Sequence, residues 1–180
     1  PAANKLLLPY LSKFTDFTLS GGTALALQLG HRISVDFDFF SPALIEKKLW
    51  NRLKTVFRGA SITPLVDTVD ELTVVIKDVK VTFLYYPYPS LAEPVIWSDI
   101  RMFSVPDIAA TKAQTVGRRS TYKDYFDLYF ILETKKLTLS EIISLAEQKF
   151  GDDFNGRIFL EQLVYHADIT DTNIKLIGQT

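Results

Sequence analysis

The sequence predicts an α+β protein, because strand patterns and helix patterns are concentrated in different parts of the chain. Up to about residue 95, short apolar segments alternate with turn residues, which is typical of strands and hairpins. Beyond Pro94 the apolar residues recur at helical spacing, with capping signals between the segments. We therefore expect a small mixed sheet flanked by helices in residues 1–95. A helical half in residues 96–180 is expected to pack on it as part of one structural unit.

Composition indicates a globular protein without an overall attraction for polyanions. The chain has 180 residues, of which 47% are hydrophobic, so it can fill a complete core. Its 20 Lys and Arg residues nearly balance 21 Asp and Glu residues, and binding to nucleic acid would therefore need a local basic patch. The absence of Cys excludes thiolate chemistry and leaves His31 and His166 as the only imidazole ligands. Because no apolar stretch approaches the roughly 18 residues of a membrane span, we expect a cytoplasmic protein that does not enter membranes.

In residues 1–95 the patterns predict three helices and five strands. Pro9 is expected to kink or end a turn of the first helix, and Gly30 is placed to end the second in a left-handed conformation. The last three strands are separated by very short turns, which indicates an antiparallel meander. The helices are expected at 4–14, 23–30 and 44–58, and the strands at 17–20, 33–40, 61–66, 71–77 and 79–86.

Four helices are expected in residues 96–180. Pro106 suits the first turn of one of them, and Thr121 can cap the next. Thr138 and Glu141 form the capping-box pattern that opens the third, which Gly151 is expected to end. The four helices are expected at 107–116, 122–133, 139–150 and 156–166.

Two aspartates, Asp36 and Asp38, occupy alternate positions of a segment that otherwise has the character of a core strand. Side chains two apart on a strand share a face, so both carboxylates would lie together while Val35, Phe37 and Phe39 face the core. Paired carboxylates need a compensating cation, and hard oxygen ligands favour Mg²⁺ or Mn²⁺. The alternative is an edge strand with one face in water, where the alternation has no catalytic meaning.

The turn before them, Ser20–Thr23, reads Ser-Gly-Gly-Thr between a strand and a helix. Backbone N–H groups at a helix N-terminus bind phosphate well, and Gly21 and Gly22 allow an anion to approach closely. A pair of glycines can also form a tight turn and nothing more. Next to an Asp-x-Asp strand, the phosphate-binding interpretation is the better one.

Three further residues lie between the predicted helix and the aspartates. Arg32 and Ser34 would share the face of the carboxylates if the strand extends back that far, and Arg32 would then bind a triphosphate or neutralise the aspartates. Both roles fit the pattern. His31 follows the helix-ending Gly30, so we expect a surface or helix-end histidine.

The stretch "SGGTALALQLGHRISVDFDFF" closely resembles the signature of the AbiEii/AbiGii toxin family of nucleotidyltransferases, in the DNA polymerase β-like superfamily. Lys112 and the "KDYFD" segment, with Asp124 and Asp127, follow in the order that is typical of the family, so the resemblance spans residues 19–132. It implies a polymerase β-like fold and transfer of NMP from an NTP, with release of pyrophosphate, to an acceptor such as the 3′ hydroxyl of tRNA. It also implies a toxin role in toxin–antitoxin or abortive-infection phage defence, with a separate antitoxin protein as partner.

The resemblance also assigns roles to residues. It makes Asp36 and Asp38 catalytic ligands of Mg²⁺ or Mn²⁺, and Lys112 and Asp124 further catalytic residues, with Asp124 positioning Lys112 or a substrate group. The residues that it implies for binding the NTP are Ser20, Gly21, Gly22, Thr23, Arg32, Ser34 and Lys112.

The position of Lys112 can also be interpreted from helical spacing, without the family resemblance. On a helix Lys112 would fall on the apolar stripe between Ile108 and Val116, where its ammonium needs an anion unless the side chain reaches water. Asp124 follows the Thr121 cap, where the helix N-terminus alone would stabilise a carboxylate.

One position departs from the family pattern. Relatives in the superfamily use a third carboxylate on a later strand as a base, but Thr82 stands at the corresponding place here. The missing carboxylate leaves open a catalytically silent nucleotide-binding module. A second alternative, which occurs elsewhere in the superfamily, keeps the enzyme but uses a protein hydroxyl as acceptor. Two basic groups could contact RNA: Lys47, Lys54 and Arg58, and Arg118, Arg119 and Lys123.

Overall fold

The structure is a computed structural model, and it describes residues 2–116, 118–119, 121–165, 167, 169 and 172–177. His166, named above as a possible ligand, lies outside the described residues. The chain forms two compact units. The first unit consists of Pro1–Ala24, Ser34–Tyr88 and Pro94–Phe103, and the second of Leu25–Ile33, Pro89–Glu93 and Ser104–Thr180.

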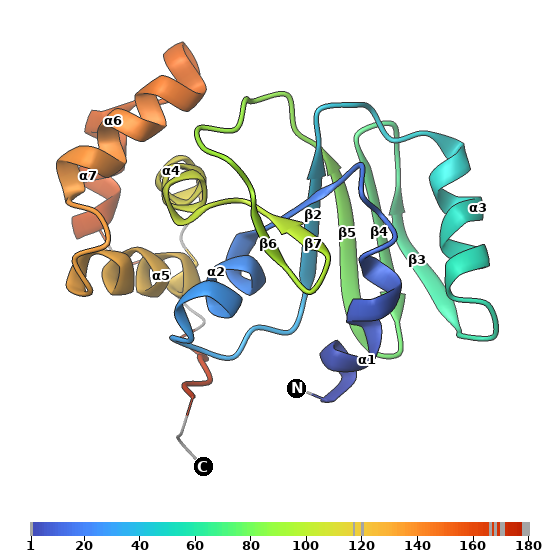
Figure 1. Cartoon of the computed structure of the whole chain (residues 1–180). Helices are drawn as coiled ribbons and strands as arrows, with labels where there is room; N and C mark the ends of the chain where they lie inside the picture. The colour runs from blue at the N-terminus through green and yellow to red at the C-terminus, as the bar shows by residue number, and fades with distance from the viewer. Residues whose placement is uncertain are drawn as a thin grey trace. The chain divides into compact units, whose positions relative to one another are not determined.

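The first unit contains a mixed sheet of seven strands in the order β3-β4-β5-β2-β1-β7-β6, seen side by side in Figure 1. Strand β2 lies in the middle, antiparallel to β1 and parallel to β5. The predicted meander is confirmed, since β3, β4 and β5 pair antiparallel in sequence. The strands are β1 Thr18–Ser20, β2 Phe37–Ser41, β3 Ile62–Asp67, β4 Glu71–Ile76, β5 Val79–Tyr85, β6 Val95–Trp97 and β7 Ile100–Met102.

Strand β2 differs from its prediction in position and neighbours. It begins at Phe37 instead of Ile33, so Asp36 immediately precedes it, and Val35 is 45% exposed instead of buried. The reason is that β1 ends at Ser20, which pairs with Asp38, and the chain there turns into a helix. Alternation in a sequence does not show where the neighbouring strand ends. Because β2 is central, the alternative of an edge strand is wrong.

Strands β6 and β7 were not predicted, and they lie where only helices were expected. Each has three residues, and they are joined by Ser98 and Asp99, whose φ angles are 46° and 62°. Strand β7 pairs in parallel with β1 through Leu19 and Met102. Strands this short carry too little periodicity to be recognised, and β1, the partner that joins β7 to the sheet, is far away in sequence.

Two helices of the first unit, α1 (Ala2–Leu11) and α3 (Lys47–Val56), accompany the sheet. Phe37, Phe39 and Phe83 are almost fully buried. The ring of Phe14, just after α1, lies 5.1 Å from that of Phe83. Burial of each such side chain contributes about 1.5–3 kcal/mol to folding. One face of β2 is thus committed to the core, as predicted.

The second unit is helical, with α4 (Val105–Val116) at its centre. Helix α4 packs against the three α-helices that follow it in the chain, which lie beside and below it in Figure 1. The capping box of Thr138 and Glu141 and the helix end at Gly151 are confirmed, whereas Thr121 occupies its cap position without a side-chain hydrogen bond. The other elements are α5 Tyr122–Glu133, α6 Leu139–Phe150, η1 Gly151–Asp153 and α7 Gly156–Val164.

The remaining helix, α2, spans Gly21–Leu29, and the boundary between the two units falls inside it. Gly30 follows with a φ of +64°, so it ends α2 in the predicted left-handed conformation. Within the described ranges, none of the helices combines the length and the apolar character that crossing a bilayer requires.

A buried ion pair holds the loop before β6 in the second unit. Lys149 Nζ lies 2.8 Å from Asp107 Oδ1 and 2.7 Å from the Pro89 carbonyl oxygen, and both charged side chains are fully buried. The Leu91 N–H and the Ser104 hydroxyl also donate to Asp107. Burial alone would raise the pKa of Asp107, but the Lys149 ammonium and these donors outweigh it and lower the pKa.

We expect Lys149→Met to lower the free energy of unfolding by about 3–5 kcal/mol, because it leaves the Asp107 carboxylate buried without its cation. Lys48→Met is the matched control, since Lys48 pairs with Glu46 at the surface with 78% of its side chain exposed, and it should cost less than about 1 kcal/mol. Urea unfolding of the three proteins measures both. Equal losses would contradict a stabilising role for the buried pair.

Candidate active site

The two aspartates lie at the start of β2 in the first unit. Asp38 is flanked by Ser20 of β1 on one side and Thr82 of β5 on the other. Both carboxylates are half-exposed, and Asp36 Oδ2 lies 3.7 Å from Lys80 Nζ, with both of these side chains nearly half exposed. An ion pair this open is weak, so it leaves Asp36 able to exchange Lys80 for another cation.

The glycine turn meets the Asp38 carboxylate directly. Gly21, the first residue of α2, has a φ of +67°, and a Cβ built on it would lie 2.9 Å from Asp38 Oδ2. Only glycine satisfies both the backbone conformation and this contact. The sequence predicted phosphate-binding backbone and carboxylates in one place, and the structure puts Gly21 and Asp38 in contact.

Thr23 fixes the segment that carries Asp36. Its hydroxyl hydrogen-bonds to the Asp36 carbonyl oxygen and lies 2.8 Å from the Ser34 hydroxyl. These hydroxyls are therefore engaged inside the chain, and a phosphate contact from Thr23 would have to come from its backbone N–H. Ser20 is fully buried, and within the described part of the chain its Oγ has no hydrogen-bond partner.

The donor set fits a hydrated Mg²⁺ or Mn²⁺. Among the residues that the structure describes, no three His, Asp or Glu side chains gather as a metal cage. Asp36 and Asp38 supply two oxygen-ligand side chains, which is enough for Mg²⁺, because it keeps several waters and binds through one or two carboxylates. Thr82 stands beside Asp38, with its hydroxyl 3.1 Å from that of Thr73.

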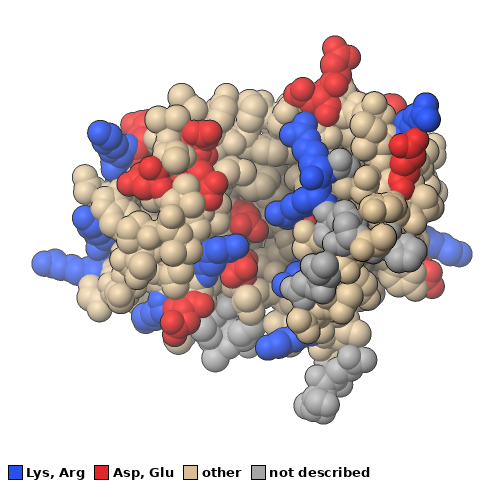
Figure 2. All heavy atoms as spheres, turned by 180° about the vertical axis from the view of Figure 1, so that it is seen from behind, with Lys and Arg blue, Asp and Glu red and all other residues tan. Residues whose placement is uncertain are grey.

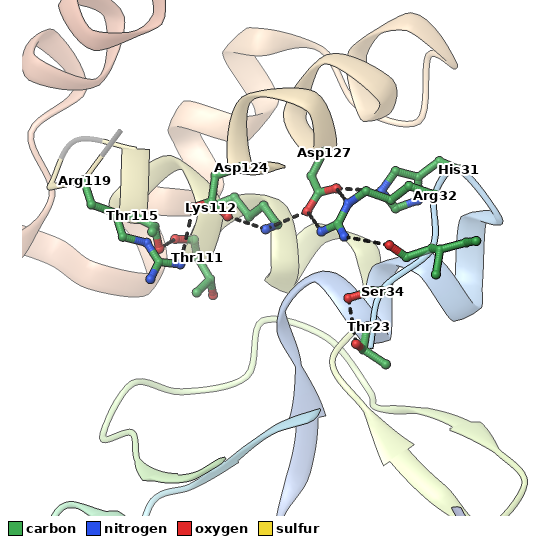
Figure 3. A network of polar contacts seen from close by, with 11 residues as sticks. Thr23, His31, Arg32, Ser34, Thr111, Lys112, Thr115, Arg119, Asp124 and Asp127 are labelled. Atoms are coloured by element: carbon green, nitrogen blue, oxygen red, sulfur yellow. Dashed lines mark hydrogen bonds and ion pairs between the residues drawn. The ribbon is translucent and has the colours of Figure 1, made fainter. Parts of the chain in front are cut away.

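A second polar cluster lies in the second unit and is centred on Asp127 of α5, as Figure 3 shows. Arg32 binds both carboxylate oxygens of Asp127, at 2.6 and 2.8 Å. His31 Nε2 lies 2.6 Å from Asp127 Oδ1 and Lys112 Nζ 2.7 Å from Asp127 Oδ2. Asp127 is fully buried, so the cluster is an internal network.

Lys112 is shared between two carboxylates. Its ammonium also lies 2.6 Å from Asp124 Oδ1, and its side chain is 7% exposed. The alternative in which Lys112 reaches water is therefore wrong. The anion that its position demanded is supplied by α5, where Asp124 and Asp127 are three residues apart and share a face. That spacing is the sequence signal for this network. Arg119 lies 3.3 Å from the other oxygen of Asp124, with its own side chain largely exposed.

The segment after α2 corrects one expectation and narrows another. The strand does not extend back to Arg32, so Arg32 does not share a face with Asp36 and Asp38, and its guanidinium is paired with Asp127. Of the two places expected for His31, the helix end is confirmed, since it follows Gly30, and the surface is wrong, since His31 is 6% exposed. Asp127 contacts both residues and lies 95 residues after Arg32 in sequence, so no local pattern shows these contacts.

Opposing effects act on the pKa of Asp127. Burial would raise it, but hydrogen bonds from Arg32 and His31 and the positive charge of Lys112 outweigh burial and hold the pKa well below its usual range. The carboxylate is therefore ionised at every ordinary pH. A group with a lowered native pKa stabilises the fold above its unfolded pKa, and this contribution is lost as the pH falls.

Solved structures of other proteins share this fold. The chain is similar to JHP933 from Helicobacter pylori, with a TM-score of 0.60 and 20% identity over 91% of this chain and 88% of that one. It is also similar to MenT4, the nucleotidyltransferase toxin Rv2826c from Mycobacterium tuberculosis H37Rv, with a TM-score of 0.56 and 18% identity over 87% of this chain and 65% of that one. The fold is that of polymerase β-like nucleotidyltransferases, as predicted.

The family follows from the sequence as a whole. The family model described as nucleotidyl transferase AbiEii toxin, Type IV TA system, matches residues 8–176. Uncharacterized protein aq_aa25 of Aquifex aeolicus (strain VF5) is 33% identical over 156 residues, which cover 85% of this chain and 75% of that protein. The chain belongs to the AbiEii toxin family and is a nucleotidyltransferase, which confirms the resemblance.

We expect Asp127→Asn to lower the free energy of unfolding at pH 7 by about 3–5 kcal/mol, because Arg32 would lose its carboxylate partner and Lys112 would keep only Asp124. The wild type should lose stability below about pH 4, where the unfolded carboxyl takes up a proton. The variant should lose less over the same range. Urea unfolding at pH 7, 5 and 3 measures this, with Asp16→Asn, at an exposed ion pair with Arg52, as control. An unchanged acid dependence in Asp127→Asn would contradict the assignment.

We expect Gly21→Ala to impair activity and stability more than Gly30→Ala does. Both glycines have a positive φ, of +67° and +64°, but only at Gly21 would the new Cβ meet an atom, Asp38 Oδ2. Gly30→Ala should cost about 1 kcal/mol from the backbone alone. Gly21→Ala should cost more, because the carboxylate must move. Thermal unfolding and a nucleotidyl-transfer assay of both variants make the comparison, and equal effects would argue against the contact.

Proposed function

We propose that Asp36, Asp38 and the Ser20–Thr23 turn form a site that transfers a nucleoside monophosphate from an NTP to the 3′ hydroxyl of an RNA. The observation that carries the proposal is the contact between Gly21 and the Asp38 carboxylate. It joins a helix N-terminus, which favours phosphate, to the oxygen ligands that a divalent cation prefers.

Each part of the proposed site has its own role in binding the NTP. Backbone N–H groups of Gly21, Gly22 and Thr23, in the first turn of α2, hold the β- and γ-phosphates. Asp36 and Asp38 would hold Mg²⁺ or Mn²⁺, which when bound neutralises charge on the reacting phosphates. Thr23 keeps Asp36 in place through its carbonyl oxygen. Gly21 has no side chain to displace the carboxylate of Asp38.

Lys112 and Asp124 remain proposed catalytic residues. Their ion pair within the second unit supports a role for Asp124 in positioning the Lys112 ammonium. Arg32 is no longer proposed as a phosphate ligand, because Asp127 binds its guanidinium through both oxygens. We assign no dedicated general base, since Thr82, and not a carboxylate, stands beside Asp38 on β5.

The RNA acceptor, an antitoxin partner and a cytoplasmic location are proposed from the family resemblance and from membership of a toxin family. The formal net charge of -1 gives RNA no overall attraction, and basic and acidic side chains are interspersed over the face in Figure 2. The basic groups are local: on α3, Lys54 lies over the Trp50 ring, and Arg118 and Arg119 precede α5. Binding should therefore depend on short-range contacts at the 3′ end.

We expect Asp38→Asn to lower the rate of transfer by about 100-fold or more, since it removes a charge that acts on the reacting phosphates. The assay combines the protein, Mg²⁺, total tRNA and each of the four α-labelled NTPs in turn. Asp67→Asn is the control, because Asp67 is an exposed carboxylate at the end of β3 in the same sheet. Circular dichroism of each variant reports whether the fold is kept.

Label in RNA from the wild type and Asp67→Asn, but not from Asp38→Asn, supports the proposal and identifies the donor. Label in protein would replace RNA by a protein hydroxyl as acceptor. NTP binding without any labelled product would favour a silent nucleotide-binding module. Undiminished transfer by Asp38→Asn would refute the metal-binding role of the two aspartates.

A further inference from the structure

Three aromatic side chains of the first unit lie together on the face of the sheet that carries Asp38. Phe40 is two residues beyond Asp38 on β2 and therefore shares its face. The ring of Tyr86 is stacked on that of Phe40, with centroids 4.6 Å apart and planes at 29°. The Tyr88 ring lies 5.2 Å from that of Tyr86. We call Phe40, Tyr86 and Tyr88 the aromatic cluster.

The cluster is packed against Phe103 and is only partly buried. Phe103, which is 7% exposed, packs against the rings of both Phe40 and Tyr86, and the Tyr86 N–H donates to the Ser41 carbonyl oxygen at 2.7 Å. The three cluster residues are each only half-buried. Aromatic rings that are fixed in position and partly open to solvent form a surface on which another flat ring can stack.

The strand pairing places the cluster on the opposite side of Asp38 from α2. Strand β1 runs antiparallel to β2, with Thr18 opposite Phe40 and Ser20 opposite Asp38, and α2 begins directly after Ser20. Along β2 the order is therefore the start of α2, then Asp38, then Phe40. The Cα atoms of Asp38 and Phe40 are about 7 Å apart at ordinary strand spacing.

Phosphoryl transfer gives this order a chemical meaning. The attacking and leaving oxygens lie roughly in line on opposite sides of the α-phosphorus. A bond forms between the acceptor 3′ oxygen and the α-phosphorus, the bond from that phosphorus to the bridging oxygen breaks, pyrophosphate leaves, and the hydroxyl proton passes to solvent. If pyrophosphate is held at α2, the acceptor must approach from the side of Phe40.

We propose that the aromatic cluster stacks the terminal nucleobase of the RNA acceptor. This inference rests on the proposed function and deepens it. Every nucleobase has a face that stacks on aromatic rings, so such a surface selects an unstacked end instead of a sequence. The cluster is a positioning site: it fixes the last nucleotide so that its 3′ hydroxyl lies at Asp38.

The test measures binding apart from turnover. The probe is a short single-stranded oligoribonucleotide with 2-aminopurine as its 3′-terminal base, whose fluorescence is quenched when the base stacks, and no NTP is present. We expect quenching by the wild type. Tyr86→Leu and Tyr88→Leu should each weaken binding about 10-fold and reduce the quenching. NTP affinity, measured separately, should not change.

Three controls make the result specific. Tyr88→Phe keeps the ring and should bind as the wild type does, which a role of the phenol hydroxyl would not allow. Tyr129→Leu removes a tyrosine that is 57% exposed in the second unit and should have no effect. Asp38→Asn should still quench the probe, since stacking needs no catalysis.

Each outcome decides the inference. Absence of quenching by the wild type, or unchanged RNA affinity in folded Tyr86→Leu and Tyr88→Leu, overturns it. Weaker NTP binding with unchanged RNA binding also overturns it, because the cluster would then hold the donor base. If label enters RNA while these variants bind normally, only the stacking site fails. If label enters protein, the proposed function fails and the inference with it.

Discussion

The contact between the Asp38 carboxylate and Gly21 is the constraint on which the site depends. It requires β1 to end at Ser20, α2 to begin there in a positive-φ conformation, and β2 to lie beside β1 in one register. A shift of β2 by one residue would send Asp38 into the core and Phe39 to the surface. The aromatic core around Phe39 and Phe83 excludes that shift. Packing of Phe39 on one face of β2 thus positions the Asp38 carboxylate on the other face.

The second unit relies on charge balance instead. The positive charges of Arg32 and Lys112 are balanced by the carboxylates of Asp124 and Asp127. His31 also contacts Asp127. Removing an ionised group from water costs several kcal/mol, and pairing with opposite charges and hydrogen bonds is needed to offset this cost. Such a network specifies one arrangement of its helices, because any other leaves a buried charge without a partner.

Along one face of the central strand, three kinds of chemistry follow one another. The first turn of α2 suits phosphate, Asp36 and Asp38 suit a divalent cation, and the ring of Phe40 with Tyr86 suits a base. The proposed transfer from a triphosphate to a nucleic acid end would use these three groups in this order. The proposed metal site and the proposed acceptor site thus lie next to each other on the same face of β2.

The sequence by itself determined the local structure: helix ends at Gly30 and Gly151, the capping box at Thr138, and the strands with clear alternation, because these depend on residues a few positions apart. The Asp-x-Asp pattern and the glycine turn also indicated the family. Only the tertiary structure decided the rest. Where β2 begins depends on its neighbours β1 and β5. Strand β7 forms by pairing with β1, and β6 by pairing with β7. Arg32 binds Asp127, 95 residues away in sequence. A residue type shows which charge or hydrogen bond must be satisfied, but the fold decides which partner satisfies it.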